Sequence, residues 1–225
     1  MLESPRYHEI WRGNPAWVAT GGQRLVDGGG FRPYIKHWHG RQAVYNLDYR
    51  ARAGRVYLSD QERADCTLKP PFAIVSPLIK KGASPNKDWG RSNWEKVIED
   101  FPVPVYQLFP AGEKPDAIKG AIPYVTPSPR NAIAAIERAA VVMSQEGGTH
   151  HMAASAGVPA VVIFGSFVPP EVTGYEFHHN IAVQTDEGYC GRWDSCNHCK
   201  EAMALIKPEE VREKALLILE SYDAD

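Results

Sequence analysis

The sequence lacks any apolar run near the roughly 20 residues that a membrane-spanning helix needs. Its opening residues, MLESPRYHEIW, also lack the basic-then-apolar order of a secretory signal. Cysteine is scarce as well, since four residues in a chain of 225 are too few for a disulfide scaffold. We therefore expect a cytoplasmic protein without a transmembrane segment, whose thiols are reduced.

A charge excess of either sign is also missing. The 25 Lys and Arg residues nearly balance 27 Asp and Glu residues, which leaves a formal net charge of -2. Such a chain has no general field to attract nucleic acid or an anionic membrane, so a phosphate-bearing partner must be held by a local site. The 44% hydrophobic content is enough to bury a sizeable core.

Hydrophobic periodicity is poor in residues 1–70, which are rich in Gly, Arg and aromatic residues. Here we expect short strands and turns, with a brief helix near 61–65 that Ser59 caps at its N-terminus. This stretch is predicted to be a short, irregular N-terminal region.

From Pro71 to the C-terminus, apolar runs alternate with amphipathic segments, a pattern typical of βα units and a parallel sheet. The predicted strands are 72–75, 103–108, 121–125, 141–143, 160–164 and, at an edge, 181–183. The predicted helices are one capped by Ser92, then 131–140, 150–156 and 208–221, the last with Leu216, Leu217 and Leu219 inward. The fold class is therefore α/β, with a Rossmann-like parallel sheet over residues 71–225.

The segment SQEGGTHHMAA (144–154) lies between a predicted strand and a helix of small residues. Gly147 and Gly148 carry no side chain that would keep an anion away from the backbone. The amides of Gly148, Thr149 and His150 are then donors at a helix N-terminus, where the dipole also favours negative charge. We interpret this turn as a site for a diphosphate.

The longer run EGGTHHMAASAGVPAVVIFG resembles the donor-binding motif of glycosyltransferase family 9, the heptosyltransferase-like enzymes of the GT-B fold. The resemblance covers about residues 71–211. It implies a GT-B C-terminal-type domain that binds a nucleotide-diphosphate sugar as donor substrate, with no further cofactor. It also implies that Glu146 approaches the transferred sugar and that Gly148 and Thr149 donate backbone hydrogen bonds to the diphosphate. His151 matches the motif histidine, which either donates to a phosphate oxygen or fixes the loop.

Two further positions carry over from the resemblance. Lys87, in the run NKDW that is followed by Trp94, resembles the family's Lys-x-Trp and would oppose the diphosphate as a point charge. Glu113 falls where the family has a glutamate for the ribose hydroxyls. Weaker candidates for the same cleft are Ser76, Lys80, Lys81, Ser84 and Asn86.

Three of the cysteines lie with a histidine in the run YCGRWDSCNHCKEAM. Cys190, Cys196, His198 and Cys199 offer a zinc-type ligand set, but their spacing crowds three ligands into four residues. We predict no metal here, and the resemblance implies a closing element of the donor domain. A disulfide between Cys190 and one of the other two cysteines stays an alternative.

The family resemblance is incomplete at the N-terminus. Full-length relatives place a complete acceptor domain first, whose opening loop supplies a carboxylate base, whereas this sequence has about 70 residues there. We interpret residues 1–70 as a truncated acceptor-side region and assign no catalytic base. Chemically able groups are Glu9, His37, His39 and Asp48, among which nothing in the sequence selects.

The leading functional hypothesis is metal-independent transfer of a sugar, such as a heptose, to a hydroxyl acceptor on a saccharide or glycolipid. One alternative is a non-catalytic nucleotide-sugar-binding module, completed by another chain or as a homodimer. A nucleotide-sugar epimerase of similar fold is a third reading.

Overall fold

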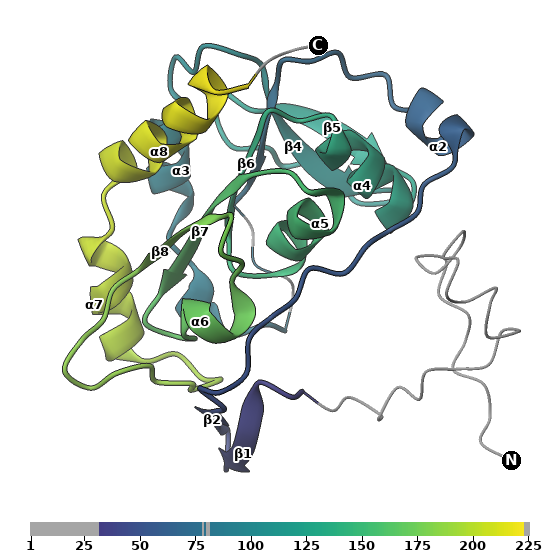
Figure 1. Ribbon diagram of the computed structural model, residues 1–225. Helices are drawn as coiled ribbons and strands as arrows, with labels where there is room; N and C mark the ends of the chain where they lie inside the picture. Colours follow the sequence, from purple (N-terminus) through teal and green to yellow (C-terminus); the bar gives the residue numbers. More distant parts are fainter. Residues whose placement is uncertain (1–31, 78, 80–81, 223–225) are drawn as a thin grey trace, which may run out of the picture.

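A sheet lies at the centre of the computed structural model (Figure 1), which describes residues 32–77, 79 and 82–222. The sheet has six strands. All neighbouring strands run parallel, in the order β5-β4-β3-β6-β7-β8. The order reverses between β3 and β6, so the chain leaves these neighbours in opposite directions and opens a crevice at their carboxyl ends. The predicted Rossmann-like sheet is confirmed. Its strands are β3 (Ala73–Ser76), β4 (Val105–Pro110), β5 (Ile122–Thr126), β6 (Val141–Gln145), β7 (Ala160–Gly165) and β8 (His179–Ala182).

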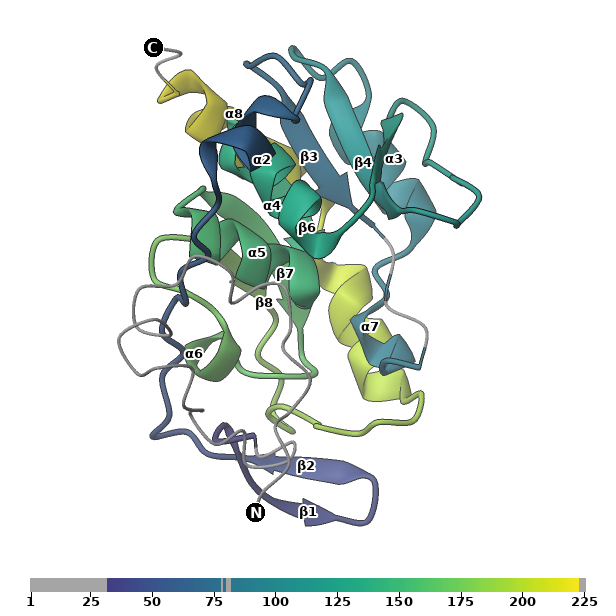
Figure 2. The same ribbon diagram turned by 90° about the vertical axis from the view of Figure 1, so that its right-hand side faces the viewer.

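Helices cover both faces of the sheet (Figures 1 and 2). One face carries α3 (Arg91–Ile98), α7 (Asn197–Leu205) and α8 (Pro208–Glu220), and the other carries α4 (Pro129–Glu137) and α5 (Gly148–Ala156). Alternate residues of each central strand therefore enter different cores, which explains why these strands are apolar throughout.

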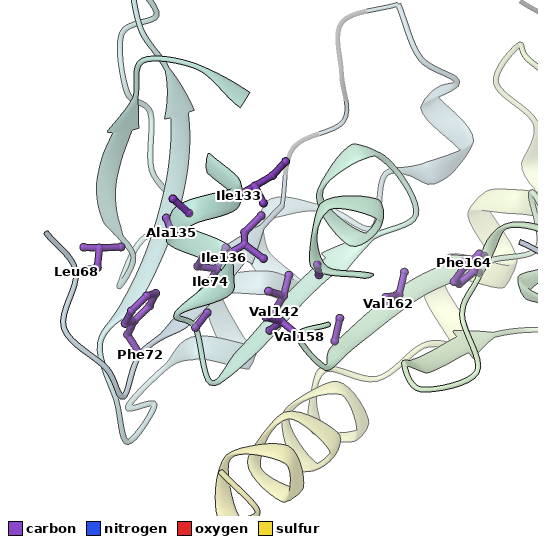
Figure 3. Close-up of a cluster of buried hydrophobic side chains, with 14 of the residues drawn as sticks. Leu68, Phe72, Ile74, Ile133, Ala135, Ile136, Val142, Val158, Val162 and Phe164 are labelled. Carbon is purple, nitrogen blue, oxygen red and sulfur yellow. The ribbon is translucent and has the colours of Figure 1, made fainter. Parts of the chain in front are cut away.

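Figure 3 shows the core beneath α4 and α5, where Ile74, Val142 and Val162 from three neighbouring strands meet Ile133 and Ile136 of α4. These side chains are fully or almost fully buried. Burying a side chain of this size stabilises the fold by about 1.5–3 kcal/mol. The carboxyl ends of the strands are thus supported by a rigid layer.

Helix ends test the sequence predictions most directly. Gly157 ends α5 at a left-handed φ of 72°, as its small size predicts. The prediction that Ser92 caps α3 is wrong: the helix begins at Arg91 after Gly90, whose φ of 91° makes the turn instead. The prediction of three inward leucines in α8 is also wrong for Leu217, which is 53% exposed. The buried positions of α8 are Val211, Ala215 and Ile218.

The described part of the N-terminal region, residues 32–70, contains a hairpin of β1 (Ile35–His39) and β2 (Gln42–Tyr45), followed by α2 (Asp60–Ala64). Ser59 caps α2 in a capping box with Glu62, which confirms the predicted N-cap. The hairpin lies beyond the carboxyl ends of the strands, and residues 46–59 run from it along the side of the domain to α2 (Figures 1 and 2). Helix α2 packs on α4, where Arg130 pairs with Glu62. Within the described residues no helix is long and apolar enough to cross a membrane.

Candidate functional site

The turn between β6 and α5 is open in front of its backbone. Gly148, the first residue of α5, is exposed, and a Cβ built on it meets no atom within 4 Å. Gly147 has an extended backbone, with φ 165°, that any residue can adopt. Because the fold itself does not demand glycine at either position, the missing side chains leave space at the helix N-terminus for a ligand.

The first-turn amides of α5 fall into two groups. Those of Gly148, Thr149 and His150 have no carbonyl one turn earlier in the helix to bond, and they point to the end where the dipole favours an anion. The amide of Gly147 instead donates to Nδ1 of His150 at 2.9 Å. The Gly147 amide is therefore already bonded, and donation from the other three amides to a diphosphate stays a prediction.

His150 supports the turn with its side chain. The ring is fully buried, accepts from the Gly147 amide at Nδ1, and donates from Nε2 to the carbonyl of Thr173 at 3.0 Å. Burial, together with the neighbouring His151, lowers the pKa of His150 to about 3. The imidazole is thus neutral at pH 7 and links the turn to α6 (Pro170–Thr173).

Glu146 and Lys87 form an ion pair beside the turn. Lys87 ends the 3-10 helix η2 (Pro85–Lys87), and its Nζ also lies 5.3 Å from the ring centroid of Phe167. Burial raises the pKa of Glu146, but Lys87 together with His150 and His151 lowers it by more, so the pKa lies below its usual value. The lysine predicted at the diphosphate therefore contacts the acidic residue of the glycine-turn motif.

Polar side chains tie the loops of the crevice together at the point where the strand order reverses. Gln145 donates from Nε2 to the carbonyl of Pro77 at 3.0 Å and accepts from the amide of Trp89 at 3.4 Å. The hydroxyls of Ser76 and Thr149 lie 2.9 Å apart. The loops after β3 and β6 are thus joined.

The two tryptophans that follow Lys87 anchor the loop that carries this residue, called the lysine loop, in the core. Trp89 and Trp94 are buried and meet edge to face, with ring centroids 4.9 Å apart. Trp89 also donates from Nε1 to the carbonyl of Ile206 at 3.3 Å. The Lys-x-Trp spacing therefore holds Lys87 at a fixed distance from packed aromatic rings.

His151 lies on the first turn of α5 and is exposed. Its Nδ1 lies 2.8 Å from the hydroxyl of Tyr175, on the segment after α6. This bond supports the loop-fixing role, and a phosphate contact of His151 stays a prediction.

Three tyrosines beside the site were not predicted. Tyr45, at the end of β2, donates its hydroxyl to the carbonyl of Phe167 at 2.9 Å. Burial raises the pKa of Tyr45, and so does the negative charge of Glu146; both effects also act on Tyr34. Tyr34 packs on Tyr49 with centroids 6.4 Å apart. The aromatic content of this stretch was the available signal, but no spacing rule connects it with residue 146.

Other candidates lie elsewhere. Glu113 is exposed in the loop after β4, and its ribose role stays a prediction. The suggestion that Ser84 and Asn86 line the cleft is wrong, because both are buried with their side chains on backbone atoms of residues 192–196. The chemically able His37, His39 and Asp48 are exposed on the hairpin and just after it. Glu9, Lys80 and Lys81 lie outside the described residues.

The cysteine-rich run folds into a cluster. One candidate ligand atom from each of Cys190, Cys196, His198 and Cys199 lies within 4.8 Å of all the others. Sγ of Cys190 is 2.9 Å from that of Cys199 and 3.6 Å from that of Cys196, and none of these cysteines forms a disulfide. The crowded spacing therefore does not keep the four groups apart.

Comparisons with known proteins agree on the fold. No protein-family model matches the sequence, and no curated protein matches it. Among solved structures, the E. coli ADP-heptose lps heptosyltransferase II is 16% identical with a TM-score of 0.55, over 74% of this chain and 54% of that one. The glycosyl transferase family 9 protein from Veillonella parvula DSM 2008 is 16% identical with a TM-score of 0.55, over 76% and 56%.

A third solved structure is the bacterial iron-containing dodecameric glycosyltransferase TibC from enterotoxigenic E. coli H10407. It is 16% identical with a TM-score of 0.56, over 74% of this chain and 49% of that one. The chain thus spans about half the length of these heptosyltransferase-type structures. The likeness confirms the predicted GT-B type of Rossmann-like domain.

Proposed function

We propose that residues 71–225 bind a nucleoside-diphosphate sugar as a glycosyl donor, with residues 1–70 forming an acceptor-side region. The observation that carries this proposal is the exposed Gly148 turn, with its first-turn amides, at the reversal point of the strand order. The Glu146–Lys87 pair beside it supplies a cation for the diphosphate and a carboxylate for sugar hydroxyls.

The proposed reaction is displacement at the anomeric carbon. The acceptor hydroxyl oxygen forms a bond to that carbon, the bond from the carbon to the phosphate oxygen breaks, and the nucleoside diphosphate leaves with the electron pair. The amides of Gly148, Thr149 and His150, the α5 dipole and Lys87 stabilise the growing negative charge, a task that a metal ion performs in other transferases. The proton of the hydroxyl passes to a base that we do not assign.

ADP-heptose is the donor that we propose to test first. TibC was solved in complex with ADP-D-beta-D-heptose, in a structure 14% identical to this chain with a TM-score of 0.52. The proposed acceptor is a hydroxyl group of a saccharide or glycolipid. UDP-, GDP- and CDP-sugars are the comparison donors, because nothing in the phosphate site distinguishes the base.

A non-catalytic nucleotide-sugar-binding module is the second candidate, since the residues of the proposed site hold a donor and no base is assigned among them. In that case another chain or a second copy would complete the site. Donor binding without turnover, together with dimerisation, identifies this outcome. Release of nucleoside diphosphate that depends on an acceptor identifies a transferase, and an altered sugar without acceptor identifies an epimerase.

The binding test compares thermal unfolding with and without each donor. A donor at one hundred times its dissociation constant should stabilise the protein by about 2.7 kcal/mol. Gly148→Asp should abolish this gain, because a carboxylate at that point repels the diphosphate while it favours the helix N-terminus. Gly54→Asp is the matched control, since it adds the same charge at another exposed glycine whose Cβ also meets no atom within 4 Å. Equal stabilisation of both variants by ADP-heptose contradicts the proposed phosphate site.

A further inference from the structure

The cluster of Cys190, Cys196, His198 and Cys199 lies where the loop after β8 enters α7. We propose that these four residues bind one tetrahedral divalent transition-metal ion, Zn²⁺ or Fe²⁺, which fastens this loop to the hairpin and to the lysine loop. The four candidate ligand atoms lie within 4.8 Å of one another. In a tetrahedral site with bonds of about 2.3 Å, ligand atoms are about 3.8 Å apart. The observed sulfur separations of 2.9 and 3.6 Å and the 4.8 Å limit bracket this spacing, so the four atoms are close enough to share one ion.

The hydrogen bonds of His198 leave one ring nitrogen for a metal. The hydroxyls of Ser166 and Thr185 both donate to the carbonyl of Gly188, so each is left to accept from the ring. Nε2 of His198 lies within hydrogen-bond distance of both hydroxyls and must carry the proton that it donates to them. Nδ1 then keeps its lone pair, 3.9 Å from Sγ of Cys199. Metal-binding histidines usually have such a partner, which fixes the ring nitrogen that does not bind the metal.

Two of the three sulfurs accept hydrogen bonds from backbone amides, as metal-bound sulfurs can. The amide of Arg192 donates to Sγ of Cys190 at 3.4 Å, and the amide of Cys199 donates to Sγ of Cys196 at 3.4 Å. Cys196 is also the N-cap residue of α7, at the positive end of its dipole. A single disulfide would use two of these cysteines and leave the third sulfur and the His198 lone pair without a function.

The ligand set selects the class of ion. Thiolates are soft ligands that suit zinc and iron, and imidazole suits both metals as well. Four protein ligands close a tetrahedral shell, which is typical of a structural site rather than of a catalytic one with an open position. Cys199 is fully buried and the other three ligands are partly buried, so the ion would sit inside the loop.

The loop that carries the cluster forms backbone hydrogen bonds to the β1–β2 hairpin. The carbonyl of Gly191 accepts from the amide of Ala43 at 2.9 Å, and the amide of Trp193 donates to the carbonyl of Arg41 at 2.9 Å. Gly191 has a φ of 59°, and a Cβ built there would lie 2.1 Å from the Ala43 oxygen. Only glycine permits this close approach, so loop and hairpin fit together in one arrangement.

The same loop also holds the residue next to Lys87. The side chain of Asn86 donates to the carbonyls of Arg192 and Asp194, each at 2.8 Å, and accepts from the amide of Cys196 at 2.9 Å. An ion that fixes Cys190 and Cys196 therefore fixes both ends of the segment that Asn86 bonds. The metal site stands independently of the proposed function, although it would position Lys87 for it.

The first test measures metal content in the full chain, purified without chelator under reducing conditions. Elemental analysis should find about one zinc or iron ion per chain. Cys199→Ser and Cys196→Ser should each reduce the content at least tenfold, whereas Cys66→Ala, which alters a buried cysteine outside the cluster, should retain it. Co²⁺ added to the metal-free chain should give the visible absorption of tetrahedral thiolate coordination.

The second test addresses His198 through its partner. Thr185→Val removes a hydroxyl that orients Nε2 of His198 and leaves all four ligand residues in place. It should weaken zinc affinity about 10–100-fold. Hydrogen exchange should speed up in residues 41–45 and 84–90 after chelation, because both segments bond the loop. These readouts need no sugar donor, so they are separate from the test of the proposed function.

Three results would overturn the site. One is a purified chain with less than one-tenth of an ion that also gives no Co²⁺ absorption. Another is a mass two hydrogens lower under non-reducing conditions that the Cys66→Ala chain also shows, which places a disulfide within the cluster. The third is a Cys199→Ser chain that keeps its metal.

Discussion

The glycine turn at 147–148 and the cysteine loop at 190–196 both lie at the carboxyl ends of the strands, yet they are held differently. The turn is made by consecutive residues between β6 and α5, and buried Met143 and Ala153 on either side of it enter the two cores. The loop takes its partners from Ala43 and Asn86, far away in the sequence. The turn is therefore built between two cores, whereas the loop packs on the edge of one core and is held to distant segments by hydrogen bonds.

The difference has an energetic side. Apolar burial on both sides contributes to the stability of the turn, and it does not depend on geometry in detail. The loop depends on backbone hydrogen bonds that are worth about 0.5–1.5 kcal/mol each. We therefore expect the loop to open before the turn does, and the predictions below test this order.

The largest loss of unfolding free energy should come from breaking the ion pair between Lys87 and Glu146, which joins the lysine loop to the glycine turn. Lys87→Met leaves the carboxylate of Glu146, whose side chain is 8% exposed, without its cation. Loss of one partner of a buried pair costs about 3–5 kcal/mol of unfolding free energy. Urea unfolding at pH 7 measures the loss. The double variant Lys87→Met with Glu146→Gln should recover most of it, and a single variant within 1 kcal/mol of wild type would show that the pair is solvated.

Acid should weaken the turn through His150. Below its ordinary pKa of 6.5, the unfolded chain binds a proton that the folded chain does not take up until pH falls to about 3. Stability is thus lost as pH falls through this window, by about 2 kcal/mol between pH 6.5 and 5. His178, whose pKa burial lowers to about 4, acts in the same direction.

The variant His150→Asn separates the two histidines. Its side-chain oxygen can replace Nδ1 as acceptor for the Gly147 amide, but it does not titrate. The fall in unfolding free energy between pH 6.5 and 5 should be about 2 kcal/mol smaller than in wild type. An identical pH dependence in the two proteins would exclude His150 as the group responsible.

A smaller loss of unfolding free energy should come from breaking the hydrogen bonds between Asn86, next to Lys87, and the cysteine loop. Asn86→Ala removes three hydrogen bonds and leaves the Cys196 amide without its acceptor, at a cost of about 1–3 kcal/mol. Hydrogen exchange should rise in residues 190–196 and leave the 147–150 turn unchanged. Ser84→Ala, which loses one bond to the same loop, is the control and should cost less.

The smallest loss of unfolding free energy should come from breaking an exposed ion pair of the cysteine loop. Arg41 pairs with Asp194, and their side chains are 68% and 65% exposed. Such a pair contributes about 0–1 kcal/mol and is weakened by salt. Arg41→Ala should therefore shift the unfolding midpoint little at low salt and not at all at high salt. A loss above 2 kcal/mol would mean that the hairpin is held by this pair and not by the backbone of Gly191.

Local patterns predicted most of the sheet and the turn. Apolar runs located the strands because both faces of a parallel sheet are covered, and the Gly-Gly-Thr run located the helix N-terminus. The Ser92 prediction failed because Gly90 supplies the turn by its backbone, which a search for side-chain caps does not register. Ser84 and Asn86 were misplaced because their partners, at residues 192–196, are more than 100 positions away.

By itself, the sequence determined the parallel sheet, the glycine turn between strand and helix, and the nearness of Lys87 to buried tryptophans, because each depends on residues within a few positions of one another. The tertiary structure decided what pairs with what: Lys87 with Glu146, Asn86 with the cysteine loop, Tyr45 with Phe167 and His198 with two hydroxyls. These contacts join distant segments through the order of strands in the sheet, and side-chain chemistry alone allows many pairings that only the packed backbone selects.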